Sequence, residues 1–437
     1  MCTMRKDPID KLLVIPITRF MNNSTTSGIL LFASAVLALI LANSPLKDVY
    51  HHFWENTFSI GFGDFVVSKS LHHWINDGLM SIFFFVVGLE LKREVMAGEL
   101  SRPKDAILPL FAGLGGMIVP ALLYLIFNSS GETSTGWGIP MATDIAFALG
   151  ILYMLGNKVP VSLKVFLTAL AIADDLGAVL VIAFFYTSHI SMVSLLIGGG
   201  FLLVLILANI LGVRNTLFYG IVGIAGLWLA FLLSGIHATI AGVLAALTIP
   251  ANVKIQDTKF IEKIKSLISK FEKSTPNNVT LVTHEQLEIL EDIRYYSKGA
   301  MTPLQRLEHA MHPLVAFVVM PIFALANAGI TFSGDFFNDL SSNVSLGIIF
   351  GLALGKFIGI ISVSKILVKL KFATLPEGVN WRQMYGVAML AGVGFTMSLF
   401  ITDLAFVNPT YIIQAKIGIF MASILCGVGG YFTLRKA

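Results

Sequence analysis

The chain has 437 residues, of which 56% are hydrophobic and only 13% are charged. Soluble domains carry about 25% charged residues, so the composition excludes a soluble enzyme, a nucleic-acid-binding protein and a disulfide-stapled secreted domain. The net charge of +4 therefore indicates orientation in a membrane rather than affinity for an acidic partner. Cys2 and Cys426 lie at opposite ends of the chain and predict neither a disulfide framework nor a metal-ligand cluster.

Long apolar segments recur along the chain, each close to the ~20 residues that a helix needs to cross a lipid bilayer. The segments are continuous rather than alternating, which excludes a membrane β-barrel. We predict an all-α polytopic membrane protein, a single integral membrane domain over residues 1–437. About twelve transmembrane helices are expected, centred near Phe32, Phe84, Gly115, Ile145, Leu176, Val204, Gly226, Ala245, Val319, Leu354, Gly392 and Met421.

The lysines and arginines predict the orientation. If the N-terminus is cytoplasmic and the helices alternate, 26 of the 30 basic residues fall in inner loops or ends, and two, Lys47 and Lys69, fall in outer loops. Long loops report orientation weakly, but the ratio is still 17 to 2 when the 251–309 loop is left out. Both termini are therefore expected to be cytoplasmic.

Residues 50–70 follow the first predicted helix. Apolar and polar side chains alternate there on both sides of a turn at Gly61 and Gly63, which predicts an external β-hairpin. An isolated hairpin is only marginally stable. It is therefore expected either to pair with a second copy across a homodimer or to fold onto its own membrane domain.

Residues 251–309 are expected to form a long, charged cytoplasmic loop. Within it, six apolar residues share one helical face opposite lysines, namely Phe260, Ile261, Ile264, Leu267, Ile268 and Phe271. This pattern predicts an amphipathic helix, which either lies on the inner leaflet or forms a solvated linker.

Five ionisable residues lie within the apolar segments: Asp77, Asp144, Asp174, Asp175 and Lys356. Each costs ~2.5–3.5 kcal/mol at membrane depth, so we expect them to line a water-filled path or to pair with one another. A buried ion pair that only locks helices together is the alternative. One lysine cannot neutralise all of these acids, which leaves negative charge for a mobile cation.

The adjacent Asp174 and Asp175 point ~100° apart on a helix, so both can border one cavity. Two carboxylates this close resist ionising together, and we expect at least one to hold a proton near physiological pH. Carboxylate oxygens are also hard ligands for a small cation. A proton and a metal ion should therefore compete for this site.

Two helices are expected to be broken mid-membrane. Pro140 and the Thr143–Asp144 pair interrupt the fourth segment, and a glycine-containing stretch, 391–398, interrupts the eleventh. Paired interruptions in two halves of a transporter indicate its substrate site, because freed backbone groups must line a polar cavity. Asp144 and Lys356 would offset the charge of the half-helix ends that meet there.

The third to fifth helices resemble the tenth to twelfth, aligning Lys164 with Lys416. In the topology above, Lys164 enters from inside and Lys416 from outside, so the two repeats are inverted. Chance similarity between Gly/Leu-rich segments is the alternative.

Seven motifs, in order over nearly the whole chain, resemble those of the bacterial sodium/proton antiporter family NhaA, which contains inverted-repeat transporters. They are WINDGLM at 74–80, VGLELKRE at 87–94, ATDIAFALG at 142–150, ADDLG at 173–177, SGIHAT at 234–239, ALANAG at 324–329 and GFTMS at 394–398. The resemblance implies a homodimer joined by the external hairpin in the cell inner membrane. It also implies pH-regulated, electrogenic exchange of internal Na⁺ or Li⁺ for external protons, with no resident cofactor. The 251–309 loop departs from this pattern, because it is longer than expected for the best-known members.

The resemblance further assigns a cation and proton site to Asp174, Asp175, Thr143 and Asp144. Lys356 then compensates charge, either as a proton carrier or only as the partner of Asp174. Asp77 corresponds to an acidic residue of the outer cavity. The pH-sensing candidates are Glu90, Arg93, Glu94, His237, Glu308, His309 and His312; taken alone, these histidines would more often be packed or helix-end residues.

Two other classes of protein are alternatives to the exchanger. An ion channel would use the same polar path without reorientation, and would dissipate a pH gradient without requiring sodium or lithium. The sequence Gly-Phe-Gly-Asp at 61–64 suggests an intramembrane aspartyl protease. It falls in the external turn rather than in an apolar helix, so no enzyme is expected.

Overall fold

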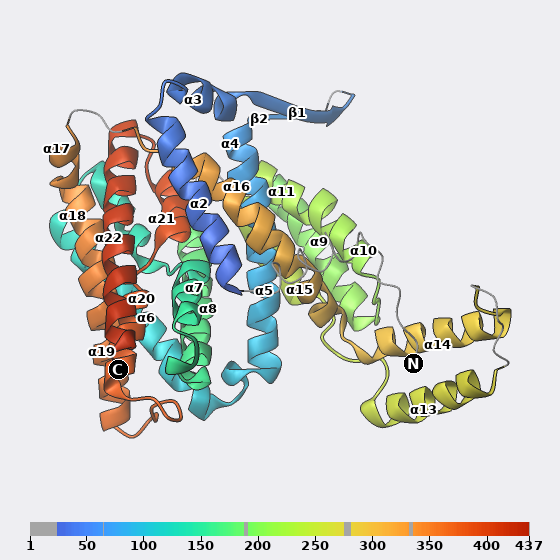
Figure 1. Cartoon of the computed structure of the whole chain (residues 1–437). Coiled ribbons are helices and arrows are strands. Elements are labelled where there is room, and N and C mark those ends of the chain that lie inside the picture. Colours follow the sequence, from blue (N-terminus) through green and yellow to red (C-terminus); the bar gives the residue numbers. More distant parts are fainter. Residues whose placement is uncertain (1–23, 64, 188–190, 275–280, 332–334, 437) are drawn as a thin grey trace.

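The computed structural model describes residues 24–436 except 64, 188–190, 275–280 and 332–334. Within this part, nine spans are long and apolar enough to cross a membrane, or up to eleven if each of two bent helix pairs is one span. Together with one short apolar helix, α12 (Ala238–Thr248), they account for each of the twelve predicted segments. The all-α, multi-span fold is thereby confirmed (Figure 1).

The spans differ in how regular they are. Four are uninterrupted helices: α6 (Pro103–Phe127), α8 (Val161–Phe185), α9 (Met192–Ile210) and α22 (Pro409–Arg435). Four contain a π-helical turn: α4–η2–α5 (Leu71–His73, Trp74–Leu79, Met80–Ala97), α10–η6–α11 (Thr216–Ile221, Val222–Trp228, Leu229–Ser234), α15–η7–α16 (Pro303–Leu314, Val315–Val319, Met320–Asn327) and α18–η8–α19 (Asn343–Phe350, Gly351–Gly355, Lys356–Lys369). Such turns are frequent at functional sites, and η8 directly precedes Lys356.

Both predicted breaks are present. The fourth segment consists of a 3₁₀ helix, η4 (Glu132–Met141), and an α-helix, α7 (Ile145–Met154), joined by three non-helical residues. The eleventh consists of α20 (Trp381–Leu390) and α21 (Phe395–Ala405), bent by 42°. The backbone N–H of Asp144 donates to the carbonyl of Val393 at 2.7 Å, so the two breaks are joined directly and satisfy each other's backbone groups.

The predicted hairpin is confirmed as strands β1 (Thr57–Phe62) and β2 (Phe65–Ser70), paired in register from Thr57↔Ser70 to Phe62↔Phe65. Gly63 has a φ of +61°, which glycine adopts without steric cost. The hairpin and the preceding helix α3 (Lys47–Glu55) project from the end of the molecule opposite the C-terminus (Figure 1). Phe58, Ile60 and Val66 stay at least 51% exposed, so this sheet leaves apolar surface uncovered.

The predicted amphipathic helix is α13 (Asp257–Lys273), and a second helix that the sequence reading did not anticipate, α14 (His284–Ala300), packs against it. Leu267 and Ile289 are 5% and 7% exposed. Ile261 and Ile268 remain 52% and 48% exposed. The segment is therefore a helical pair beside the membrane bundle (Figure 1), in which α14 covers only part of the apolar face of α13.

Glycines bring α6 and α19 into direct backbone contact. A methyl group at Gly359 would lie 2.1 Å from the carbonyl oxygen of Gly115, and one at Gly115 would lie 2.6 Å from that of Gly359. Small residues permit this approach between membrane helices. Because Lys356 is one turn from Gly359, the close contact holds its long side chain against the interior of the bundle, where it is fully buried.

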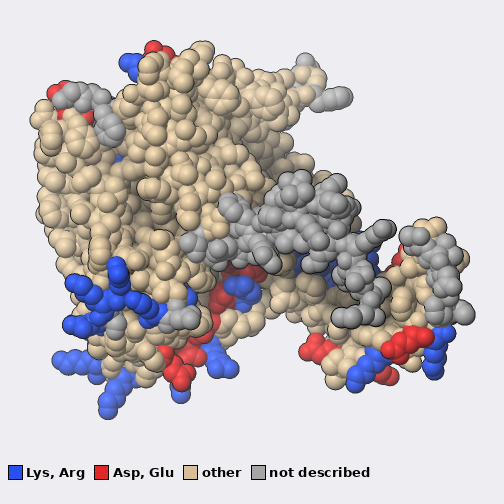
Figure 2. All heavy atoms as spheres, in the orientation of Figure 1, with Lys and Arg blue, Asp and Glu red and all other residues tan. Residues whose placement is uncertain are grey.

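The bundle begins with α2 (Ser24–Ala42), which is followed by α3 at a bend of 113°. Three short elements, η3 (Glu99–Ser101), η5 (Gly156–Lys158) and α17 (Phe336–Leu340), lie in connections. On the face shown in Figure 2, lysine and arginine side chains gather at the end of the bundle opposite the hairpin and on α13 and α14. This agrees with the charge distribution from which the orientation was predicted.

Candidate functional site

The breaks bring Asp144 to the start of two helices at once. Its Oδ1 accepts a hydrogen bond from the backbone N–H of Phe147 at 3.0 Å, which caps α7. Its Oδ2 accepts from both the backbone N–H and the hydroxyl of Thr396, at 3.0 and 2.5 Å, in the first turn of α21. One carboxylate thus meets two positive helix N-termini and ties the two half-helices together.

Asp174 carries a buried ion pair. Lys356 Nζ donates to Asp174 Oδ2 and, at 2.8 Å, to the hydroxyl oxygen of Thr143. Thr143 lies within 2.8 Å of both Asp174 Oδ2 and the carbonyl of Ala391, and its single hydrogen can bond to one of them at a time. Asp174 and Lys356 are both 0% exposed, so the charge of each depends on the other. Lys356 therefore neutralises Asp174, and the charge of Asp144 is offset by the helix ends instead.

Asp175 is the unsatisfied member of the pair. It is 0% exposed, and neither of its carboxylate oxygens has a hydrogen-bond partner among the described residues; the same holds for Asp174 Oδ1. A buried polar atom without a partner is costly, and a buried charge without one costs more. These three oxygens therefore require a proton, a cation or water.

Gly113 on α6 packs closely on one of these oxygens. A methyl group at Gly113 would lie 3.2 Å from Asp174 Oδ1, so a larger residue there would crowd this carboxylate. Among the described residues, three buried aspartates of this region, Asp144, Asp174 and Asp175, are accompanied by one buried lysine, Lys356. The excess of negative charge and the hard oxygen ligands together suit a small monovalent cation or a proton.

A second cluster of charges joins α5 to α15. Arg93 donates to Glu308 Oε1 at 2.6 Å and to Glu94 Oε1 at 2.8 Å. Three of the predicted pH-sensing residues, Arg93, Glu94 and Glu308, are thus joined by ion pairs. Glu90 lies one turn before Glu94 on α5, and α5 also packs on α8, the helix that carries Asp175.

Two of the other predicted residues, His309 and His312, lie beside this cluster on α15, whereas His237 and Asp77 lie on other elements. His309 and His312 are exposed on α15. His237 precedes α12, and its Nε2 is 2.8 Å from the carbonyl oxygen of Tyr186. Asp77 is half-buried in η2, and no contact between it and the acidic pair is found in the described part of the chain.

Thr396 is a residue that the sequence analysis missed. The carboxylate of Asp144 accepts three hydrogen bonds from described residues, and Thr396 donates two of them. Its position could have identified it, because it lies just after Gly394, at the expected start of the second half-helix. A threonine there can bond a partner across the break, but the partner is 252 positions away.

The comparisons with known proteins cover nearly the whole chain. The family model described as Na+/H+ antiporter 1 matches residues 18–434. The Na(+)/H(+) antiporter NhaA of Oleidesulfovibrio alaskensis is 51% identical over 429 residues, covering 98% of this chain and 95% of the relative. That of Acidithiobacillus ferrooxidans is 50% identical over 429 residues, and NhaA 1 of Saccharophagus degradans is 46% identical over 427 residues; each covers 97% of this chain and at least 92% of the relative. The chain therefore belongs to the Na⁺/H⁺ antiporter 1 family.

Proposed function

We propose that this protein is a secondary active antiporter that exports Na⁺ or Li⁺ in exchange for external protons. The observation that carries the proposal is the buried pair Asp174 and Asp175, in which three carboxylate oxygens have no partner among the described residues. A chain that matches antiporters over nearly its whole length and holds such a pair is a transporter and not an enzyme.

The mechanism that we propose is competition at this pair followed by reorientation. With the site open to the cytoplasm, sodium binds the carboxylate oxygens and displaces protons, since two adjacent buried carboxylates cannot both stay charged without a cation. Asp174 must then give up its ion pair with Lys356 and bind the cation instead. With the site open to the outside, protons displace sodium and the cycle restarts.

We propose that the two broken helices are the elements that move in this cycle. Asp144 and Thr396 join α7 to α21, and Thr143 joins the first break to Asp174. A tilt of the joined half-helices therefore changes which side of the membrane reaches the acidic pair. If more than one proton returns per sodium ion, the membrane potential drives export with ~2.3 kcal/mol per charge per 100 mV.

The exchange itself is measured in proteoliposomes that hold an imposed pH gradient and the purified protein. We expect Na⁺ or Li⁺ to dissipate the gradient, and K⁺ to have little effect, because the site selects a small cation through hard oxygen ligands. Dissipation without any added cation would instead indicate a proton channel. No dissipation with Na⁺ or Li⁺ would contradict the proposed function.

We further propose that Glu90, Arg93, Glu94 and Glu308, together with His309 and His312, make transport depend on cytoplasmic pH. The supporting observation is the pair of ion pairs from Arg93 to Glu94 and Glu308, which joins α15 to α5, a helix that packs on the α8 helix of Asp175. A dependence of exchange on internal pH that is unchanged in Arg93→Gln would contradict this role. His237, which lies elsewhere, is proposed to act on the outer cavity beside Asp77.

We propose, too, that the protein lies in the cell inner membrane with both termini in the cytoplasm, and that it forms a homodimer through the external hairpin. The support for the dimer is the exposed apolar surface of β1 and β2 and the free edge that each strand of a two-stranded sheet retains. Removal of residues 57–70 should convert the dimer to a monomer in native mass spectrometry. A dimer that survives this deletion would place the interface elsewhere.

A further inference from the structure

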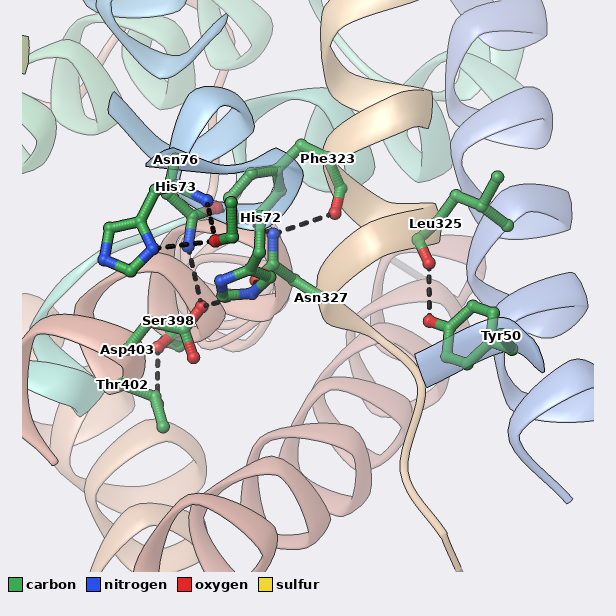
Figure 3. A network of polar contacts seen from close by, with 11 residues as sticks. Tyr50, His72, His73, Asn76, Phe323, Leu325, Asn327, Ser398, Thr402 and Asp403 are labelled. Carbon is green, nitrogen blue, oxygen red and sulfur yellow. Dashed lines mark hydrogen bonds and ion pairs between the residues drawn. The ribbon is translucent and has the colours of Figure 1, made fainter. Parts of the chain in front are cut away.

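A second polar network joins α4 and η2 to the ends of α16 and α21 nearest the hairpin, outside the site described above (Figure 3). His72 Nε2 is 2.8 Å from Asn327 Oδ1 and 3.5 Å from Asp403 Oδ2. Asn76 donates to Asp403 Oδ2 at 3.0 Å, and Asn327 donates to Asn76 Oδ1 at 2.9 Å. Four side chains from three spans thus form a ring of three hydrogen bonds and one ion-pair contact, and Asp403 is a member of it.

Asp403 lies at one end of helix α21, and the other end of this helix contacts the buried site. It lies in the last turn of α21, and Thr396, in the first turn, bonds Asp144. Eleven residues make a rod of about 16 Å. Ser398, between the two ends, donates to the carbonyl of Ile139 in η4 at 2.8 Å. A change in how Asp403 is held is therefore transmitted to the break that carries Asp144.

His72 is the member of the ring that water reaches best. Its side chain is 33% exposed, against 10% for Asp403, and Asn327 is fully buried. Asn327 Oδ1 can only accept a hydrogen bond, so Nε2 of His72 carries the hydrogen and Nδ1 takes a second proton. Histidine is the side chain that ordinarily changes charge between about pH 5 and 8. A proton on Nδ1 turns the contact with Asp403 from a weak polar contact into an ion pair.

The other charges near His72 do not replace Asp403 as its partner. On its own span lie His73, whose Nδ1 is 2.9 Å from Ser70 Oγ, and Asp77. The hairpin contributes Lys69, and α16 carries no ionisable side chain. Helix α3, which also packs on α4, carries the ionisable residues Lys47, Asp48, Tyr50, His51, His52 and Glu55.

We propose that His72 and Asp403 are positioning residues that latch the outer end of α21 to α4 and α16, and that external protons close this latch. When His72 is charged, α21 is held and the path to the outside stays shut. When His72 is neutral, α21 is released to tilt with α7, and the acidic pair opens outward. This inference rests on the antiport function proposed above and on the orientation predicted from the basic residues.

The test measures sodium efflux from right-side-out membrane vesicles at a fixed internal pH, with external pH varied from about 5.5 to 8. His72→Gln keeps a donor for Asn327 but cannot become charged. We expect the ratio of its rate to that of the wild type to rise toward the acid end, by no more than about tenfold for each pH unit, which is the steepest change that one proton can cause. The ratio should approach one at the alkaline end. The matched control, His73→Gln, changes a neighbouring exposed histidine that bonds Ser70 instead, and should follow the wild type throughout.

Further variants of Asp403 and His72 ensure that the test does not depend on the behaviour of one variant protein. Asp403→Asn should behave as His72→Gln, and Asp403→Glu, which keeps the charge, should retain the response to external pH. His72→Arg, with a permanent charge, should be slow at every external pH. A ratio for His72→Gln that is constant, or that follows internal rather than external pH, would overturn the latch. Absence of sodium-dependent efflux in the wild type would instead refute the antiport function.

Discussion

Replacing Asp175 by asparagine is expected to abolish sodium-dependent proton exchange while leaving the fold intact. The buried carboxylate has no partner among the described residues, so its neutral isostere breaks no hydrogen bond of the protein. The transported cation, in contrast, loses a charged ligand in a buried site. The comparable loss of one partner from a buried ion pair costs about 3–5 kcal/mol, and 3 kcal/mol is already a factor of about 100 in affinity.

The measurement is the dissipation of a pH gradient by Na⁺ in proteoliposomes, with thermal unfolding in detergent as the check on folding. Asp105→Asn is the matched control, because Asp105 is exposed in the first turn of α6 and takes no part in the site. We expect it to exchange like the wild type. An Asp175→Asn protein that exchanges sodium at the wild-type rate would contradict the proposed site.

Replacing Lys356 by methionine is expected to have the largest effect on stability. The change leaves Asp174, which is fully buried, without its cationic partner. Breaking a buried pair on one side only costs about 3–5 kcal/mol, which is a large fraction of the stability of a typical protein. We therefore expect a clear fall in the thermal midpoint in detergent. Lys365→Met is the control on the same helix, because Lys365 is exposed and only contacts aromatic rings.

The double variant Lys356→Met with Asp174→Asn separates the ion pair from packing. It removes both charges, so most of the lost stability should return, while exchange should stay absent because the cation has lost Asp174. If the single Lys356 variant is as stable as the wild type, or if Asp174→Asn does not rescue it, the two side chains are not an energetically coupled pair.

Much of the fold follows from local patterns in the sequence. The length and continuity of the apolar segments predict the spans, Pro140 and the glycines of 391–394 predict the breaks, and the alternation around Gly63 predicts the hairpin. These signals depend on nearest neighbours along the chain, where hydrogen-bond geometry and helix length decide the structure. No comparable local pattern predicts the π-helical turns or the helices α3 and α14, because tertiary packing determines where these elements form.

The site was predictable in part. The cost of burying charge singles out Asp144, Asp174, Asp175 and Lys356, but it does not say which of them pair. Lys356 meets Asp174 across 182 positions only because α6 and α19 approach through their glycines. The contact between His72 and Asp403 is likewise invisible in the sequence, since each residue alone is an ordinary polar residue near a helix end. A pairing between distant helices requires the assembled bundle.

The central claim is that Asp174 and Asp175 hold either protons or a sodium ion, but not both. The most direct measurement is the affinity of the purified protein for Na⁺ as a function of pH. Where binding displaces one proton, the apparent sodium affinity should fall by about tenfold for each pH unit toward acid, and sodium added to weakly buffered protein should release protons. Sodium affinity that stays constant with pH, with no proton release, would contradict the account.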